Sequence, residues 1–412
     1  MTSGKGHSSR LRWVMISLVL VATIINYLDR QTLSVLAPTL RQEFRMSATA
    51  YGRIVFLFML AYTIMNGLSG PMIDRLGTKA GYALTVAWWS AAEVLHALSR
   101  GAVSLGVFRF LLGMGEAGNW PAGVRVVAEW FPAEERALAS GIFNSGSSIG
   151  ALLAPPLVAF IVLRFGWQRA FSLIGLTGFV WLAAWLVIYR TPVRIKTEDA
   201  AEPVSVKALL RSKFLWQFTA SKVLSDPVWY FYIFWFPQYL STARGFTLVE
   251  IGKTAWIPFL AADAGNLLGG AASLIWLKRG HSARNAHRYA VVLFSLLMTA
   301  AIPAVLARSA AWAIGLVALA AMGYTAALAN MLAIPADVFP KNTVATIWGF
   351  ASMGAGFGGM LFSLATGAIV DRYGFTPAFL LFGTVPVVAA GLVWTLPREE
   401  WRGGQLSKIP EI

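Results

Sequence analysis

Among the charged residues that stand inside apolar runs of the sequence, four are concentrated in two runs of its first half. Asp29 and Arg30 are adjacent in one run, while Arg109 and Glu116 lie seven residues apart in another, two turns of a helix. A charge inside a membrane span costs roughly 2.5–3.5 kcal/mol on insertion scales, so each is a functional candidate. Burial favours the neutral form of a carboxyl group, and a guanidinium fork matches a carboxylate anion. We therefore predict that Asp29 and Glu116 carry protons and that Arg30 and Arg109 bind an anionic substrate.

The alternative is that the four residues only neutralise one another and brace the first helix against the fourth. Buried ion pairs stabilise poorly for their number of charges, which favours a functional role. Arg109 shares a helix face with Glu116, so we expect it to be the local partner of that carboxylate and to tune it. Arg30 points about 100° away from Asp29 around the helix and is expected to hold the substrate carboxylate.

The composition requires a membrane around these residues. Hydrophobic residues make up 57% of the chain and charged residues 13%, with a mean hydropathy of +0.63, which is too apolar for a soluble domain. Apolar runs separated by Gly, Pro and charge clusters predict twelve helices long enough to cross a hydrocarbon core. The expected spans are residues 13–37, 50–70, 80–98, 103–124, 136–162, 170–190, 214–240, 249–276, 289–307, 310–334, 343–369 and 377–396.

An internal repeat organises these spans into two bundles. Residues 131–171 align without a gap on residues 339–379, at a constant offset of 208, and thirteen of the 41 positions are identical. The fold class is therefore an all-α membrane protein with two pseudo-symmetric six-helix bundles, residues 1–190 and 214–412, joined by a cytoplasmic linker, residues 191–213. In such parallel repeats the substrate binds between the halves near mid-membrane, and the halves rock around it.

The net charge of +15 is explained by membrane topology. With both termini in the cytoplasm, including a short C-terminal tail, the inner segments hold 21 Lys and Arg residues and the outer segments eight, as the positive-inside rule demands. The basic residues form no groove with interleaved aromatics, so nucleic acid is not an expected partner. The chain has no cysteine and four scattered histidines, so neither a metal nor a cofactor is expected. The first apolar run is interpreted as a retained helix rather than a signal peptide.

The loop between the second and third spans carries a recognisable motif. Residues 70–79 read GPMIDRLGTK and resemble the GxxxDRxGxK signature of the major facilitator superfamily. The motif residues Gly70, Asp74, Arg75 and Gly77 are expected to form a gating loop on the cytoplasmic side. Glycines permit a tight turn, and Asp74 is expected to engage a neighbouring helix N-terminus and to hold one conformation until transport breaks the contact.

Further motifs lie along essentially the whole chain, at residues 26–30, 109–121, 129–136, 143–150, 226–229, 235–237 and 259–270. They resemble the motifs of the anion:cation symporter family, particularly its bacterial hexuronate transporters. The resemblance implies a proton-coupled importer of hexuronates or related sugar acids in the inner membrane. Members that carry galactonate use an Asp-Arg pair in helix 1 and an Arg and a Glu in helix 4, which match Asp29, Arg30, Arg109 and Glu116. Hexuronate transporters can have Thr before the helix 1 Arg, so Asp29 departs from them toward the aldonate type.

A sugar acid also needs stacking surface and hydroxyl partners. Candidate residues for this role are Tyr27, Tyr230, Tyr232, Ser147, Asn330 and Ser352. Their alternative role is packing, because aromatic residues often face lipid and small polar residues hold helices together. Lys222 and Asp263 are expected to pair with each other or with the backbone, and Arg53 to attract anions or to snorkel toward the headgroups.

Other classes of protein find less support. An enzyme should show a nucleophile with its base, and the sequence has no GxSxG or HExxH pattern; it also lacks the GxxxxGK loop of ATP-driven transport. The prediction is therefore a monomeric secondary transporter and not an enzyme, with protons, the lipid bilayer and a small anion as its partners. Small monocarboxylates or aromatic acids as substrates, and sodium as the coupling ion, remain alternatives; a membrane-bound receptor or enzyme is a further one.

Overall fold

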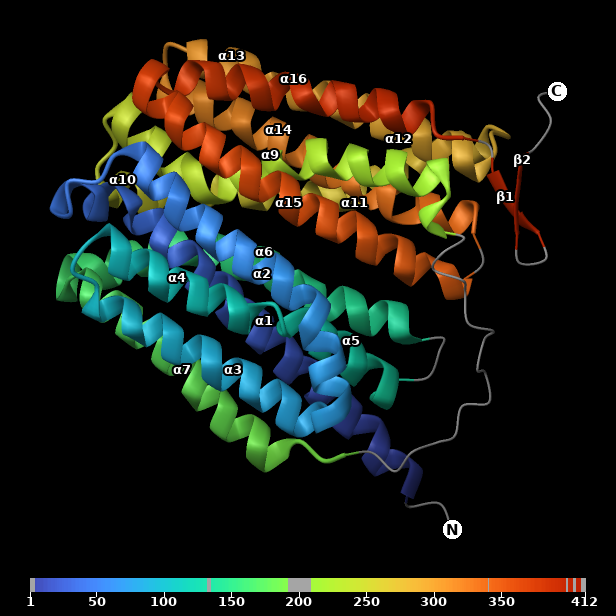
Figure 1. The fold of residues 1–412 in the computed structure, drawn as a ribbon, viewed down its shortest axis with the longest axis horizontal. Helices are drawn as coiled ribbons and strands as arrows, with labels where there is room; N and C mark the ends of the chain where they lie inside the picture. The colour runs from blue at the N-terminus through green and yellow to red at the C-terminus, as the bar shows by residue number, and fades with distance from the viewer. Residues whose placement is uncertain are drawn as a thin grey trace. The chain divides into compact units, whose positions relative to one another are not determined.

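The computed structural model describes residues 4–131, 135–191, 209–339, 341–397, 399–402 and 405–408, most of them in long helices (Figure 1). Most of the predicted linker lies outside these residues, as do Pro132 and Glu134 of the symporter motif. The chain forms two compact units. The first is Met1–Lys196 together with Pro237–Trp256, and the second is Thr197–Phe236 together with Ile257–Ile412.

The first unit is a bundle around the central helix α1. Its helices are α1 (Gly4–Glu43), α2 (Ala48–Leu76), α3 (Thr78–Leu95), η1 (His96–Leu98), α4 (Ala102–Glu116), α5 (Asn119–Trp130), α6 (Arg136–Phe165), α7 (Trp167–Ile188) and α10 (Leu248–Thr254). Helix α1 packs mainly on α6, α2 on α4, and α3 on α7, as Figure 1 also shows for α3 and α7. Residues 25–37 of α1 are all buried, so even adjacent residues that point in different directions lie inside the unit.

The second unit begins with most of α9 (Lys213–Arg244), whose last residues belong to the first unit. Its remaining elements are α11 (Ile257–Lys278), α12 (Ala283–Leu297), η3 (Met298–Ala300), α13 (Ala301–Leu306), α14 (Ala310–Ala333), η4 (Ile334–Asp337), α15 (Lys341–Tyr373), α16 (Phe375–Trp394), β1 (Glu399–Arg402) and β2 (Gln405–Lys408). Helix α14 is central to this unit and packs on α11 and α12. The two strands pair antiparallel in the tail, which was expected to be short and cytoplasmic.

The predicted all-α membrane fold is confirmed, although several spans are interrupted. The fourth expected span is broken after Glu116 into α4 and α5, the eighth into α10 and α11, and the ninth by η3. In the described part of the chain, nine helices are both long and apolar enough to cross a membrane. The other three spans are α3, α4 with α5, and α9. Helix α9 contains Lys222 and Asp226, and α3 contains Glu93. These charged residues lower the mean hydropathy of the two helices.

The internal repeat has a physical basis in close helix contacts. A Cβ atom added to Gly146 or Gly150 of α6 would come within 2.6–2.7 Å of backbone carbonyl oxygens of α1. Their partners in the repeat, Gly354 and Gly358 of α15, lie equally tightly against α9 at Thr219 and Val223. Small residues therefore let the fifth helix of each half approach the first, which is a common way to pack helices in a membrane.

Candidate functional site

The first unit contains a buried charge cluster built on α1, α3 and α4. All four charged residues singled out in the sequence belong to it: Asp29 and Glu116 are 0% exposed, Arg109 1% and Arg30 3%. Helix α1 brings Asp29 and Arg30 into the cluster from the centre of the bundle. Helix α4 places Arg109 in its middle and Glu116 at its last residue, where the chain turns into α5.

Arg30 and Glu116 form an ion pair across α1 and α4. The guanidinium Nε and Nη2 donate to the same oxygen, Glu116 Oε2, at 3.0 and 2.8 Å, and Nη2 reaches Asn26 Oδ1 at 3.5 Å. The expectation that Arg109 is the partner of Glu116 is therefore wrong, because Arg30 holds that carboxylate. Shared position on one helix face does not decide the pairing, because the long Arg30 side chain reaches Glu116 from α1.

Aromatic rings surround the Arg30 guanidinium. Its central carbon lies 4.8 Å from the ring centroids of Tyr27 and Tyr62, and 5.4 Å from that of Phe58. These rings offer their electron-rich faces to the cation and exclude water from its ion pair with Glu116. The arrangement holds a planar cation in one orientation, with its fork directed at a carboxylate.

Arg109 makes a different kind of contact. Its Nη2 donates to the backbone carbonyl of Asp29 at 3.3 Å, and its guanidinium lies 6.0 Å from the Phe58 ring. Within the described residues, Arg109 Nε and Nη1 donate to no hydrogen-bond acceptor, and neither carboxylate oxygen of Asp29 accepts a hydrogen bond. Asp29 and Arg109 are thus brought together in the fold through the backbone of Asp29 rather than through a salt bridge.

Sequence reasoning missed two members of the cluster, Glu93 and His96. Both are 0% exposed at the end of α3 and the start of η1. His96 Nδ1 lies 2.7 Å from the carbonyl of Ala92, to which it donates, and 3.6 Å from Glu93 Oε2, which is too far for a hydrogen bond. Glu93 stands in the apolar run 80–98, so the cost of placing a charge in a membrane span, applied to this run too, would have singled it out.

The proposed hydroxyl partners are distributed over both units. Tyr27 interacts with the half-buried Ser147 of α6, so these two lie beside Arg30 in the first unit. In the second unit, Asn330 donates to the carbonyls of Gly269 and Ala326, both at 2.9 Å, and so ties α14 to α11. Tyr232 is fully buried, Tyr230 half-buried with its ring 6.3 Å from that of Phe234, and Ser352 exposed. Their contact with a substrate stays a prediction.

A second polar network of the first unit lies at the α2–α3 loop. Arg125 of α5 pairs with Asp74 and, through Nε at 2.9 Å, with Glu129, which also accepts hydrogen bonds from Thr78 at 2.7 Å and Tyr189 at 2.8 Å. Asp74 was expected to engage a helix N-terminus; its partner is instead the Arg125 side chain, which reaches it from α5. Burial and the adjacent Glu129 raise the pKa of Tyr189, so its hydroxyl remains a donor.

The other residues of this loop have the expected backbone but few side-chain contacts. Gly77 has a φ of 79°, a left-handed conformation that separates α2 from α3, as the tight turn requires. Gly70 lies inside α2 rather than in the turn, and Arg75 is exposed.

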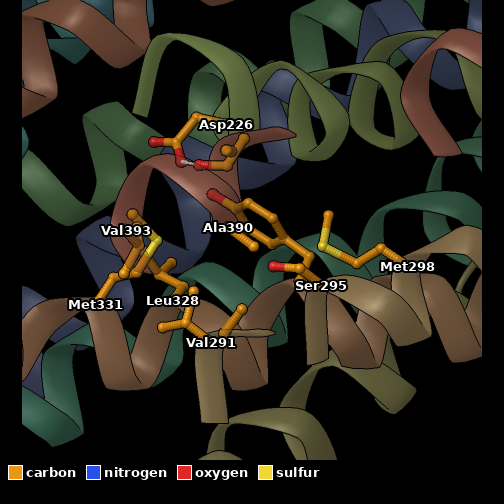
Figure 2. Close-up of a pocket in the computed structure, with 12 residues that line it drawn as sticks. Asp226, Val291, Ser295, Met298, Leu328, Met331, Ala390 and Val393 are labelled. Atoms are coloured by element: carbon orange, nitrogen blue, oxygen red, sulfur yellow. Dashed lines mark hydrogen bonds between the residues drawn. The ribbon is translucent and has the colours of Figure 1, made fainter. Parts of the chain in front are cut away.

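The second unit has its own buried ion pair. Lys222 Nζ and Asp226 Oδ1 of α9 are 2.7 Å apart, and the ammonium lies 5.4 Å from the Trp348 ring. Lys222 was expected to pair with Asp263 or with the backbone. Its ion-pair partner is Asp226, which the sequence analysis did not consider. Asp226 accepts a hydrogen bond from Ser225 at the top of a small pocket whose other walls are mostly apolar side chains of α12, α14 and α16 (Figure 2).

Comparison with known proteins matches nearly the whole chain to one family. Residues 19–282 and 281–410 match the sequence model of the Major Facilitator Superfamily. The chain is 35% identical over 405 residues to the hexuronate transporter of Escherichia coli (strain K12), with 94% of each chain covered. It is 37% identical over 286 residues to the galacturonate transporter of Dickeya chrysanthemi, covering 65% of this chain and 83% of that protein. It is 26% identical over 407 residues to the D-galactonate transporter of Escherichia coli O6:H1, covering 92% and 94%.

A solved structure shares the fold. A bacterial homologue of the human lysosomal transporter Spinster, in an inward-facing and unoccupied conformation, superposes with a TM-score of 0.73 over 93% of this chain and 95% of that one. The two sequences are 19% identical, so this likeness concerns the fold alone.

Proposed function

Because this chain belongs to the Major Facilitator Superfamily and is a multi-pass membrane transporter rather than an enzyme, we propose that it imports a hexuronate or related sugar acid by proton symport. Relatives named for hexuronate, galacturonate and galactonate align with it at 26–37% identity. The proposal places it in the inner membrane as a monomer with both termini in the cytoplasm, working by alternating access.

The buried pair between Arg30 and Glu116 is the observation that carries the proposal. Arg30 presents a fork that fits one carboxylate, and one oxygen of Glu116, Oε2, accepts from both of its nitrogens at 2.8 and 3.0 Å. A substrate carboxylate can take this place only if Glu116 gives up its charge, because an extra buried anion without a partner is costly. A proton on Glu116 removes that charge and frees Arg30, so each substrate carboxylate enters together with one proton.

This exchange keeps the charge of the site constant through the cycle. Before binding, Glu116 is the anion beside Arg30; after binding, the substrate is the anion and Glu116 is neutral. Arg109 holds the backbone of Asp29 and leaves two nitrogens directed into the same buried region, where it sets the charge balance of the acids. Tyr27 and Ser147 lie beside Arg30 and supply hydroxyl groups for a sugar, joined in this proposal by Tyr230, Tyr232, Asn330 and Ser352 of the second unit.

The network around Asp74 fits a gating role at the cytoplasmic end. Arg125 joins Asp74 of α2 to Glu129 of α5 in a partly exposed site, where ion pairs contribute little to stability and can be broken at small cost. Such contacts suit a switch that opens in each transport cycle.

Uptake by purified protein in liposomes tests this function. Radiolabelled galacturonate, glucuronate and galactonate should accumulate when the outside is made acidic, and a pH indicator inside the vesicles should report proton entry with the substrate. Lactate and benzoate serve as a small monocarboxylate and an aromatic acid for comparison. Accumulation driven by a sodium gradient at equal pH, or uptake of lactate or benzoate instead of the sugar acids, would overturn the proposal.

A further inference from the structure

The proposed exchange at Arg30 leaves one carboxyl group of the cluster without a role. Glu93 is completely buried, and among the described residues neither of its oxygens accepts a hydrogen bond. His96 does not stabilise Glu93 by a hydrogen bond. Its Nδ1 donates to the carbonyl of Ala92 and lies 3.6 Å from Glu93 Oε2. A buried carboxylate without hydrogen bonds is costly, so its presence in a membrane span requires a reason.

The packing of α3 on α4 fixes where Glu93 points along α4. The Trp88 indole donates to the carbonyl of Leu111 at 2.8 Å, and the His96 ring lies 6.0 Å from that of Phe108. Glu93 lies between these two contacts on α3, so it is level with the turn of α4 between Phe108 and Leu111.

Arg109 lies in that turn and connects Glu93 to Asp29. It approaches Asp29 through the 3.3 Å hydrogen bond to the backbone carbonyl, and its charge acts on Glu93. Asp29 and Glu93 also lie close enough to repel each other when both are ionised. Two carboxyl groups from different helices therefore lie within electrostatic range of one arginine.

The charges of the cluster do not balance unless a proton is present. Arg30 is matched by Glu116, which leaves Arg109 as the one remaining cation of the described cluster for both Asp29 and Glu93. If both were ionised, the buried site would hold one uncompensated negative charge. Two carboxylates that share a site avoid this by sharing one proton.

Among the described residues, no charged group outside the cluster acts on Asp29 or Glu93; besides each other's charge or that of Arg109, only Glu116 does so. Helix α7 contributes Arg169 and α2 contributes Arg53, Asp74 and Arg75, all of which are exposed. The charged residues of α5, Arg125 and Glu129, are engaged at the α2–α3 loop. Buried His96 already lies near the positive charge of Arg109, which disfavours a second positive charge on its ring.

We propose that Glu93 is an additional proton-binding residue, which shares one proton with Asp29 around Arg109. This inference rests on the proton-coupled function proposed above and extends its proton site from α1 and α4 to α3. In the resting protein the pair holds one proton and one negative charge, the latter matched by Arg109. Asp29 and Glu93 thus act as one titrating unit rather than as two independent acids.

Infrared spectroscopy of the substrate-free protein at neutral pH tests the shared proton without relying on transport. A protonated carboxyl group absorbs apart from a carboxylate, and labelling Asp or Glu with carbon-13 shifts the band of the group concerned. The wild-type protein should show one protonated carboxyl group assigned to this pair. Glu93→Gln should lose it, because Asp29 alone with Arg109 is ionised, and Asp29→Asn should lose it for the corresponding reason.

The double variant Glu93→Gln/Asp29→Asn makes the test specific. If the two residues share one proton, the spectrum of the double variant lacks one protonated carboxyl group relative to the wild type, as does the spectrum of each single variant. Ser90→Ala, one turn away on α3, removes a buried polar group without a charge and should keep the band. The wild-type spectrum decides the matter even if a variant fails to fold: absence of a protonated carboxyl group at neutral pH would overturn the proposal. A band unchanged in Glu93→Gln, or one displaced by added sodium, would do the same.

Failure of the shared-proton proposal can be distinguished from failure of the proposed proton symport. If wild-type vesicles take up galacturonate without protons, symport fails whatever the infrared result. If symport holds, gradient-driven uptake by Glu93→Gln should have its half-maximal rate at a lower outside pH than the wild type, because Asp29 loses a like-charged neighbour. A pH profile identical to the wild type would leave Glu93 without a part in coupling.

Discussion

Replacing Glu116 by Gln tests the coupling between proton and substrate most directly. Glutamine is close in shape to a protonated glutamate, so Arg30 loses its charged partner but keeps its aromatic surroundings. Breaking a buried ion pair by removing one partner costs about 3–5 kcal/mol. In the wild type at high pH, an entering anion must break the ion pair between Arg30 and Glu116. In the variant this ion pair does not exist, so substrate binding does not have to break it.

The expected effect on affinity follows from that difference. If even about 1.4 kcal/mol of the cost is recovered, galacturonate should bind the variant about tenfold more tightly at high pH than it binds the wild type. Wild-type affinity falls as pH rises, because binding takes up a proton on Glu116. The variant cannot take up that proton, so the slope of log Kd against pH should decrease by about one.

Isothermal titration calorimetry in two buffers of different ionisation enthalpy measures both the affinity and the protons taken up. In vesicles, Glu116→Gln should also lose proton-driven accumulation while keeping exchange of internal for external galacturonate. Glu43→Gln is the matched control, because it removes an exposed carboxylate at the end of α1 that accepts from Trp167 at 2.6 Å. An unchanged pH slope together with surviving gradient-driven accumulation would refute the reasoning.

Three other substitutions test the site and its supports. Arg30→Lys loses the forked contact and the stacked geometry, so affinity for galacturonate, measured by calorimetry, should fall about tenfold or more; near-native binding would contradict the role of Arg30. Gly150→Ala places a Cβ atom 2.6 Å from a backbone carbonyl of α1 and should lower stability by about 1–3 kcal/mol in thermal melts, whereas Gly141→Ala on the same helix meets no atom and should be neutral. Equal melting temperatures of Gly150→Ala and Gly141→Ala would show that α6 can shift away from α1 to accommodate the added methyl group. Arg125→Ala unpairs two carboxylates in a partly exposed site, so it should lower the melting temperature only slightly, though more than Arg75→Ala, which removes an exposed arginine of the same loop; the reverse order would argue against the pairing of Arg125 with Asp74 and Glu129.

The sequence by itself determined the fold class and most of the site. Apolar runs of the required length leave the backbone little choice except helices, because every polar backbone group must be satisfied within the membrane. The repeat offset of 208 predicted two related halves, and the glycines that define it make equivalent close contacts in each. The resemblance to the major facilitator superfamily is confirmed by the family match over both halves. Asp29, Arg30, Arg109 and Glu116 were found from the cost of their burial, and the structure brings all four together.

The tertiary structure alone decided how these residues pair. Sequence spacing favoured Arg109 as the partner of Glu116, because both lie on one face of α4. In the folded unit Arg30 reaches Glu116 from α1, and Arg109 turns to the Asp29 carbonyl. In the same way, the structure pairs Asp74 with Arg125 and Lys222 with Asp226. Periodicity places a residue on a face of its own helix, but pairing depends on which helix lies opposite and at what height.

That distinction explains why Glu93 emerged only from the structure as a member of the site. Its position in an apolar run marks it as unusual, but not as a neighbour of Asp29. The contact of α3 with α4 sets its height beside Arg109, and the pairing of Arg30 with Glu116 leaves that arginine to two acids. The balance of charge in a buried site is a property of all the helices that enclose it, so no single stretch of sequence contains it.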